Sequence, residues 1–133
     1  MTESLEVGRS LELEKLVTRD LTADRFGNPG VQVFATPALI AFLEETAIRC
    51  VAPTLEDGQA TVGTRVEVQH LSATPAGMKV FSKVELVEID RKRLVFRFEA
   101  RDERERIATG IHDRFIISSI ARFLDAAAEK SNG

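Results

Sequence analysis

Hydrophobic and polar residues alternate through most of the second half of this chain. The alternation covers residues 60–71, 94–101 and 107–117, a shorter stretch of the same kind covers residues 10–18, and residues 78–89 form a long run of β-favouring residues. Because successive side chains of a strand point to opposite faces of a sheet, the pattern predicts five strands. Charged turns at residues 90–93 and 102–106, which we expect to be solvated, separate the last three strands. Such short turns are typical of an antiparallel meander.

One segment has a different pattern and predicts a buried helix over residues 37–52. Thr36 is a good N-cap and Pro37 a good first helical residue, because its missing N–H would have no partner there. An apolar stripe at helical spacing is formed by Ile40, Leu43, Ala47, Ile48 and Val51. The neighbouring positions are apolar too, and a helix that is apolar almost all round is usually buried. A second, short helix is expected at about 119–129.

The order of these elements predicts an α+β domain. A helix with so much apolar surface needs cover on more than one side, and a curved antiparallel sheet wrapped around it provides that cover. This arrangement is the hot-dog fold. We expect one domain over residues 1–133, with its core at about 8–117. Its free edge strand is suited to pairing with a second copy, which predicts a homodimer or a higher homo-oligomer.

Composition excludes several classes of protein. The chain has 133 residues with a formal net charge of −3, so it lacks the excess of positive charge that binds nucleic acid or an anionic membrane. One cysteine and two histidines leave no Cys-rich or three-histidine metal site within one chain, so we expect no metal. No apolar run is long enough for a membrane helix, and the first ten residues do not resemble a signal peptide. We therefore expect a cytoplasmic protein.

Glu44 is the most informative candidate for chemistry. It lies within the apolar stripe, four residues after Ile40 and four before Ile48. Burying a lone carboxylate is costly, so a carboxylate in this place suggests a general base or a nucleophile. The alternative is that Glu44 lies at the margin of the stripe and reaches solvent. The adjacent Glu45 has the spacing of an ordinary surface pair with Arg49.

Three further residues have a functional and a structural interpretation each, and two have only a structural one. His70 ends a strand and has a pKa suited to proton transfer, but it also fits an idle histidine at the sheet rim. Thr36 fits an N-cap, or a hydroxyl beside helix N–H groups that could stabilise an oxyanion. Gly63 interrupts a β-branched strand, which indicates a bulge or the close approach of a ligand. Cys50 is expected in the core, and His112 on the polar face of the last strand in a structural role.

The spacing of these residues resembles one family, the fluoroacetyl-coenzyme A thioesterases of the hot-dog superfamily. The resemblance is carried by Ala35-Thr36-Pro37, by Glu44 in the helix, by Gly63-Thr64, by Val68-Gln69-His70, by residues 73–77 and by residues 110–114. It is strongest from about residue 33 to residue 117. The loop before Thr36 departs from the family, because residues 27–30 are Gly-Asn-Pro-Gly and Phe26 and Phe34 are its nearby aromatic residues.

The resemblance implies hydrolysis of an acyl-coenzyme A thioester. It implies a catalytic set of Thr36, Glu44 and His70, a backbone N–H of Gly63 near the thioester oxygen, and Phe34 beside the substrate. It implies no metal or redox cofactor, and a dimer with sites at the interface. It does not imply fluoroacetyl specificity, because of the departure in the loop.

Two other functions remain open from the sequence. The same fold supports enoyl-coenzyme A hydratases and dehydratases, in which Glu44 and His70 would keep proton-transfer roles. A non-catalytic acyl-coenzyme A-binding protein would not depend on either residue.

Overall fold

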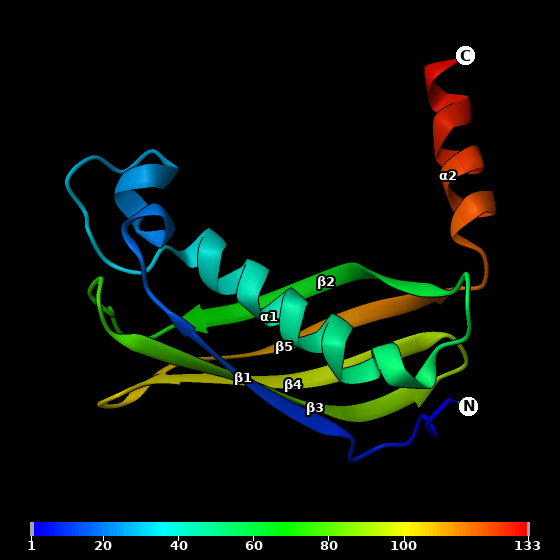
Figure 1. Cartoon of the computed structure of the whole chain (residues 1–133), viewed down its shortest axis with the longest axis horizontal. Helices are drawn as coiled ribbons and strands as arrows, with labels where there is room; N and C mark the ends of the chain where they lie inside the picture. Colours follow the sequence, from blue (N-terminus) through cyan, green and yellow to red (C-terminus); the bar gives the residue numbers. More distant parts are fainter. Residues whose placement is uncertain (1, 133) are drawn as a thin grey trace.

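The computed structural model describes residues 2–132, and its strands and helices follow the order expected from the sequence (Figure 1). The elements are β1 (Ser10–Leu16), η1 (Arg19–Leu21), η2 (Ala23–Phe26), α1 (Thr36–Val51), η3 (Ala52–Thr54), β2 (Ala60–His70), β3 (Lys79–Asp90), β4 (Arg93–Asp102), β5 (Arg106–Ile117), α2 (Ile120–Ala128) and η4 (Glu129–Ser131). The predicted strands and both α-helices are confirmed to within two residues at each end. The expected loop at 19–32 contains two short 3-10 helices.

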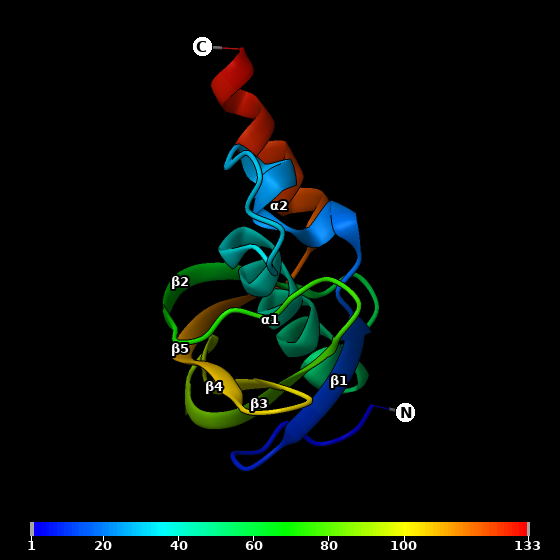
Figure 2. The ribbon, with the colours of Figure 1, turned by 90° about the vertical axis from the view of Figure 1, so that its left-hand side faces the viewer.

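The sheet is antiparallel throughout and has the strand order β1-β3-β4-β5-β2. It curves around α1, as the end-on view shows (Figure 2). The α+β arrangement of a sheet wrapped around a long helix is therefore confirmed. One consequence matters for the site: β2 is an edge strand, and its residues from Gly63 to Glu67 are exposed.

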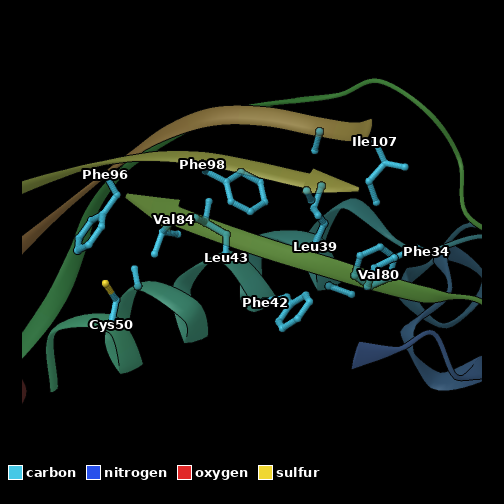
Figure 3. Close-up of a cluster of buried hydrophobic side chains, with 14 of the residues drawn as sticks. Phe34, Leu39, Phe42, Leu43, Cys50, Val80, Val84, Phe96, Phe98 and Ile107 are labelled. Carbon is cyan, nitrogen blue, oxygen red and sulfur yellow. The ribbon is translucent and has the colours of Figure 1, made fainter. Parts of the chain in front are cut away.

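The core lies between the concave face of the sheet and one side of α1 (Figure 3). Leu39 and Leu43 of α1 are fully buried against Val84, Phe96 and Phe98 of the central strands. Each such side chain contributes about 1.5–3 kcal/mol through the removal of apolar surface from water. Cys50 belongs to this cluster, which confirms its expected place in the core. The core therefore fixes the rotation of α1 about its axis.

That rotation differs from the one expected. Positions 39, 43, 46, 47 and 50 face the sheet, whereas Ile40 is only half buried and Ile48 is 44% exposed. Glu44 lies between these two isoleucines on the same side of the helix. The expectation that both belong to the buried stripe is wrong, because two adjacent lines of apolar residues run along α1 and the sheet covers only one. The uncovered line carries Glu44.

In the second half of β5 polar side chains face inward, whereas Ile107 and Ala108 at its start are buried in the core. His112 and Arg114 are buried, and Ile111 and Phe115 lie on the outer face with about 40% of each exposed. The prediction that His112 lies on a polar outer face is therefore wrong. Both faces of this strand contain apolar and polar residues, so alternation alone does not decide which one is inside. Contacts described below explain why the polar side chains point inward.

The last helix, α2, projects away from the end of the sheet (Figure 1). Ser119 caps it by accepting a hydrogen bond from the backbone N–H of Arg122 at 3.2 Å. All nine described residues of α2 are exposed. In the part of the chain from residue 2 to residue 132, neither helix has the length and apolar character needed to cross a membrane.

Candidate active site

Thr36 is in contact with His70 at the beginning of α1. The Thr36 hydroxyl lies 2.8 Å from His70 Nδ1. The prediction that Thr36 caps the helix is wrong: α1 begins at Thr36, its N-cap position is Ala35, and neither residue makes a side-chain capping bond. Pro37 thus takes the second helical position. Because the Thr36 hydroxyl does not bind its own helix, it is available to a histidine 34 residues further along the chain.

His70 ends β2 beside a cavity of about 330 Å³. Phe34, Thr36 and Leu71 also line this cavity. Burial lowers the pKa of His70 below its usual value of 6.5, although a backbone hydrogen bond with Ser72 partly offsets this effect. The imidazole is therefore neutral at pH 7. Among residues 2–132, its Nε2 atom is buried without a hydrogen-bond partner, which is unusual for a buried polar atom and leaves it free for a ligand.

Glu44 is held by a buried arginine. Nη1 of Arg114 donates to Glu44 Oε2 at 3.0 Å, and the Arg114 side chain is only 4% exposed. The rest of the guanidinium is bound to Thr61, with Nε 2.8 Å from its hydroxyl and Nη2 2.9 Å from its carbonyl oxygen. The Glu44 side chain is 40% exposed, so its carboxylate is fixed at one end and open at the other. Neither a fully buried base nor a freely solvated glutamate describes this group.

His112 completes this group and its tautomer follows from its partners. Nη1 of Arg114 lies 3.1 Å from His112 Nε2, and a guanidinium has only donors, so Nε2 accepts. Nδ1 then carries the hydrogen and donates it to the Arg65 carbonyl at 2.8 Å. Burial lowers the pKa of His112, and the Arg114 charge lowers it further. A neutral His112 therefore accepts a hydrogen bond from Arg114 and helps to hold the guanidinium in place.

Gly63 lies directly against the Glu44 carboxylate. A Cβ atom built on Gly63 would be 2.5 Å from Glu44 Oε2 and 3.2 Å from Arg114 Nη1. The register of β2 against β5 shifts between Gly63 and Arg65, which confirms the expected bulge. The absence of a side chain at this position is what lets the carboxylate approach the backbone of the edge strand.

The described residues thus form two half-sites within one chain. Thr36 and His70 form the first half-site, at the start of α1, and Glu44, Gly63 and Arg114 form the second. Eight residues of α1 separate Thr36 from Glu44, which is about 12 Å along the helix axis. No hydrogen bond joins the two half-sites in the range 2–132. Sequence reasoning missed Arg114, although a glutamate inside an apolar stripe already implies a cationic partner.

Comparison with known proteins identifies the family. A family model described as fluoroacetyl-CoA-specific thioesterase matches residues 17–120. The chain belongs to this family. A curated relative, the fluoroacetyl-CoA thioesterase of Streptantibioticus cattleyicolor, is 37% identical over 86 residues. That alignment covers 65% of this chain and 62% of the relative, so it spans less than two thirds of the relative's length.

Solved structures of the fluoroacetyl-CoA-specific thioesterase have the same fold over nearly the whole chain. One is 29% identical with a TM-score of 0.89, covering 96% of this chain and 98% of that one. A variant of that enzyme in complex with fluoroacetate and CoA is 30% identical with a TM-score of 0.85, covering 90% of this chain and 99% of that one. A thioesterase superfamily member from Thermus thermophilus, 24% identical with a TM-score of 0.89 over 98% of this chain and 96% of its own, shares the fold. The hot-dog fold and the resemblance expected from the sequence are confirmed.

Membership of the family does not by itself assign roles to residues. The structure brings Thr36 and His70 together and places Glu44 against Gly63, whereas Phe34 is buried in the wall of the cavity. Within residues 2–132, histidine, cysteine and carboxylate side chains do not gather in any group of three suited to a metal ion. The roles of these side chains belong to the proposal that follows.

Proposed function

We propose that this protein hydrolyses an acyl-coenzyme A thioester to the free acid and coenzyme A, with Thr36, Glu44 and His70 as its catalytic residues. The observation that supports it most is the Glu44 carboxylate, fixed by Arg114 and pressed against Gly63 with its other end open. A positioned carboxylate and, in the other half-site, an imidazole nitrogen without a partner in its own chain are the groups that acid–base or nucleophilic catalysis uses. Family membership favours a thioester as the substrate.

In this mechanism the acyl group passes from the sulfur of coenzyme A to the oxygen of a water molecule. Glu44 either attacks the carbonyl carbon, forming an anhydride that water then cleaves, or takes a proton from the water that attacks. In either route Nε2 of the neutral His70, which starts without a hydrogen, takes a proton from water and passes it to the departing sulfur. For Nε2 to accept a proton, Nδ1 must carry the hydrogen and donate it to the Thr36 hydroxyl, so Thr36 orients the ring. Carboxylate and imidazole supply the proton transfers, so the proposal includes no metal or redox cofactor.

The tetrahedral intermediate needs donors for its oxyanion. The backbone N–H of Gly63 is the donor we propose, since the strand at this position has no side chain in the way. The N-terminal N–H groups of α1 lie near Thr36 and add the positive end of the helix dipole. One well-placed donor is worth about 3 kcal/mol of transition-state stabilisation. Phe34 would form part of the wall beside the acyl group.

The two half-sites become one site in a homodimer. A twofold axis that pairs β2 with its copy makes the two strands antiparallel. If the pairing is centred midway between Gly63 and His70, Gly63 of one protomer lies opposite the partner's His70. The exposed run from Gly63 to Glu67 marks this part of the edge, and the uncovered Ile40 and Ile48 flank it on α1. Glu44 would then act with the partner's His70 and the partner's Thr36.

The acyl group is left unspecified in this proposal. A relative's structure holds fluoroacetate and CoA, which supports a coenzyme A thioester as the substrate class here. The Gly-Asn-Pro-Gly loop at 27–30 lines one side of the cavity through Asn28, so fluoroacetyl specificity is not part of the proposal. The proposal includes a cytoplasmic location for the protein.

Thiol release from a panel of acyl-coenzyme A substrates tests the activity. Wild-type protein should release free coenzyme A from at least one of them, and Glu44→Gln and His70→Gln should each lower kcat by about 100-fold or more. Glu45→Gln is the matched control, because Glu45 is the next residue on α1 and forms a surface pair with Arg49. No release from any substrate by folded wild-type protein would refute the thioesterase. Hydration of an enoyl substrate, or binding alone, would then be measured.

Mixed dimers test which protomer supplies each residue. Glu44→Gln and His70→Gln chains are inactive alone, but a heterodimer of the two contains one intact site if Glu44 acts with the partner's His70. Random re-association makes half of the dimers mixed, each with one of its two sites intact, so about a quarter of wild-type activity should return. Without any recovery, both residues would have to act within one chain.

A further inference from the structure

The apolar face of α2 has no partner within the described chain. Ile120, Phe123, Leu124 and Ala127 share one side of the helix, at the i, i+3, i+4, i+7 spacing of an amphipathic helix. Phe123 is 42% exposed and Leu124 58% exposed. A helix of only nine residues is marginal in water unless its apolar face packs against something. The face therefore indicates a docking surface that a single chain does not supply.

A second apolar surface surrounds the cavity beside His70. Val31 and Leu71 line this cavity and are themselves exposed. The segment from η1 to η2, next to the cavity, and α2 both stand on the side of the sheet that carries α1 (Figures 1 and 2). They stand at opposite ends of it. The two surfaces thus lie on the same side of the sheet, as a contact between α2 of one copy and the cavity of another requires.

α2 does not reach the cavity of its own chain. It begins beside the turn before β2, where the Ile120 N–H donates to the Gly58 carbonyl at 2.8 Å. The cavity lies at the other end of β2, at His70. The strand between them spans roughly 30 Å at about 3.3 Å per residue, whereas nine helical residues span only about 14 Å. The occupant of the α2 face must therefore come from elsewhere.

The proposed dimer supplies a partner for the apolar face of α2. With β2 paired to its copy about a centre between Gly63 and His70, the turn at Gly58 lies beside the segment that follows the partner's His70. That segment includes the partner's Leu71, on the rim of the partner's cavity. The same operation brings the partner's α2 to the cavity of the first protomer. We propose that α2 of each protomer lies across the partner's cavity, with Phe123 and Leu124 packed against the partner's Val31 and the partner's Leu71.

This inference rests on the homodimer of the proposed function and adds a part to its site. Each cavity would be closed on one side by a helix of the other chain, so that water is excluded and the acyl group is covered. The size of acyl group that fits would then depend on the side chains at positions 123 and 124.

Cross-linking in full-length protein tests the placement without reference to activity. A chain with Val31→Cys and Leu124→Cys is treated with a short bismaleimide and separated by denaturing electrophoresis. We expect a covalent dimer, because each linked pair would join two chains. The matched control carries Val31→Cys and Arg122→Cys, since Arg122 lies on the opposite side of α2, and should give little covalent dimer. The natural Cys50 is buried and present in both.

Three outcomes would overturn the inference. A link within one chain, running as a monomer, would mean that α2 folds onto its own cavity. A dimer in solution that forms no covalent product, or forms as much in the control, would mean that α2 lies elsewhere. A monomer in solution would remove the partner altogether. Each of these results is readable even if the protein hydrolyses none of the substrates tested.

Kinetics test whether the helix covers the substrate. Phe123→Ser with Leu124→Ser should raise KM for the preferred acyl-coenzyme A by about tenfold, the worth of roughly one buried side chain, with a smaller change in kcat. Arg122→Ser with Asp125→Ser is the control, because it changes two residues of the same helix and leaves the net charge unaltered. An equal KM in the two variants would contradict the covering role. The rest of the fold should be retained in both variants, since α2 packs on no buried surface of its own chain.

Discussion

Replacing Arg114 by methionine tests whether this residue holds Glu44 in place. Methionine keeps much of the apolar volume of the side chain and removes the guanidinium. Glu44 Oε2 would lose a donor at 3.0 Å, and the hydroxyl and carbonyl oxygens of Thr61 would lose donors at 2.8 and 2.9 Å. The accepting nitrogen of His112 would also be left without its partner.

The cost is set by what remains unpaired. Removing one partner of a buried ion pair costs about 3–5 kcal/mol, and each buried acceptor left unsatisfied costs about 1–3 kcal/mol. Because the Glu44 side chain is 40% exposed, water can replace part of the hydrogen bonding that the guanidinium supplied to its carboxylate. We therefore expect Arg114→Met to lower the free energy of unfolding by about 3 kcal/mol, the low end of that range. The control is Arg97→Met, an exposed arginine paired with Glu85, which should cost less than about 1 kcal/mol.

Urea unfolding followed by far-ultraviolet circular dichroism measures this cost, since the chain has no tryptophan or tyrosine for fluorescence. The slope of free energy against urea should not change, because the folded surface is the same. In a Glu44→Gln background the cost of Arg114→Met should shrink by about 1–3 kcal/mol, because the two residues are in direct contact. A cost of Arg114→Met below that of Arg97→Met, or one unaffected by Glu44→Gln, would show that Arg114 does not hold the carboxylate.

Three other substitutions and one pH dependence follow from the same geometry. Thr36→Val should lower the free energy of unfolding by less than about 1 kcal/mol, because no cap is lost, yet it should lower kcat for thiol release, which Thr36→Ser should retain. Gly63→Ala should push Glu44 Oε2 away from Arg114, abolish activity and lower the free energy of unfolding by up to the amount expected for Arg114→Met. Gly110→Ala, whose Cβ would meet a rigid carbonyl of β2, should destabilise strongly in the same urea assay. Burial lowers the pKa of both His70 and His112, so the unfolded chain binds more protons below about pH 6.5. The free energy of unfolding should then be level above that pH and fall below it, and His112→Gln should flatten the slope; a stability that rises on acidification would contradict both assignments.

The strands and the long helix could be predicted because their signals are local. Alternation in β4 put its buried positions on the correct face, and the apolar length of α1 marked it as the element that the sheet surrounds. The start of α1 could not be placed in the same way. Thr36-Pro37 fits an N-cap followed by the first helical residue, and equally fits the first two helical residues. The contact that decides, with His70, joins positions 34 residues apart.

Charged turns show the same limit at smaller scale. Residues 102–106 read as a solvated turn, but Asp102 is buried. Its carboxylate accepts hydrogen bonds from Thr74 and from the backbone N–H groups of Arg104 and Glu105. The first of these donors is distant in sequence, so the run of charges gives no sign of it. The expectation of a solvated turn is wrong at this one position.

The inward-facing His112 and Arg114 of β5 do not serve to bury apolar surface. Placing Ile111 and Phe115 outside and His112 and Arg114 inside gives up apolar burial and takes a cation out of water. Such an arrangement persists only where the cation has partners, and here Thr61, His112 and Glu44 supply them. Glu44 in turn has no reason to lie in an apolar stripe except to meet Arg114. Two violations of hydrophobic patterning, on elements 70 residues apart, therefore explain each other. A sequence that breaks the pattern twice with opposite charges indicates that the two positions meet, and under the proposed function the place where they meet is the catalytic site.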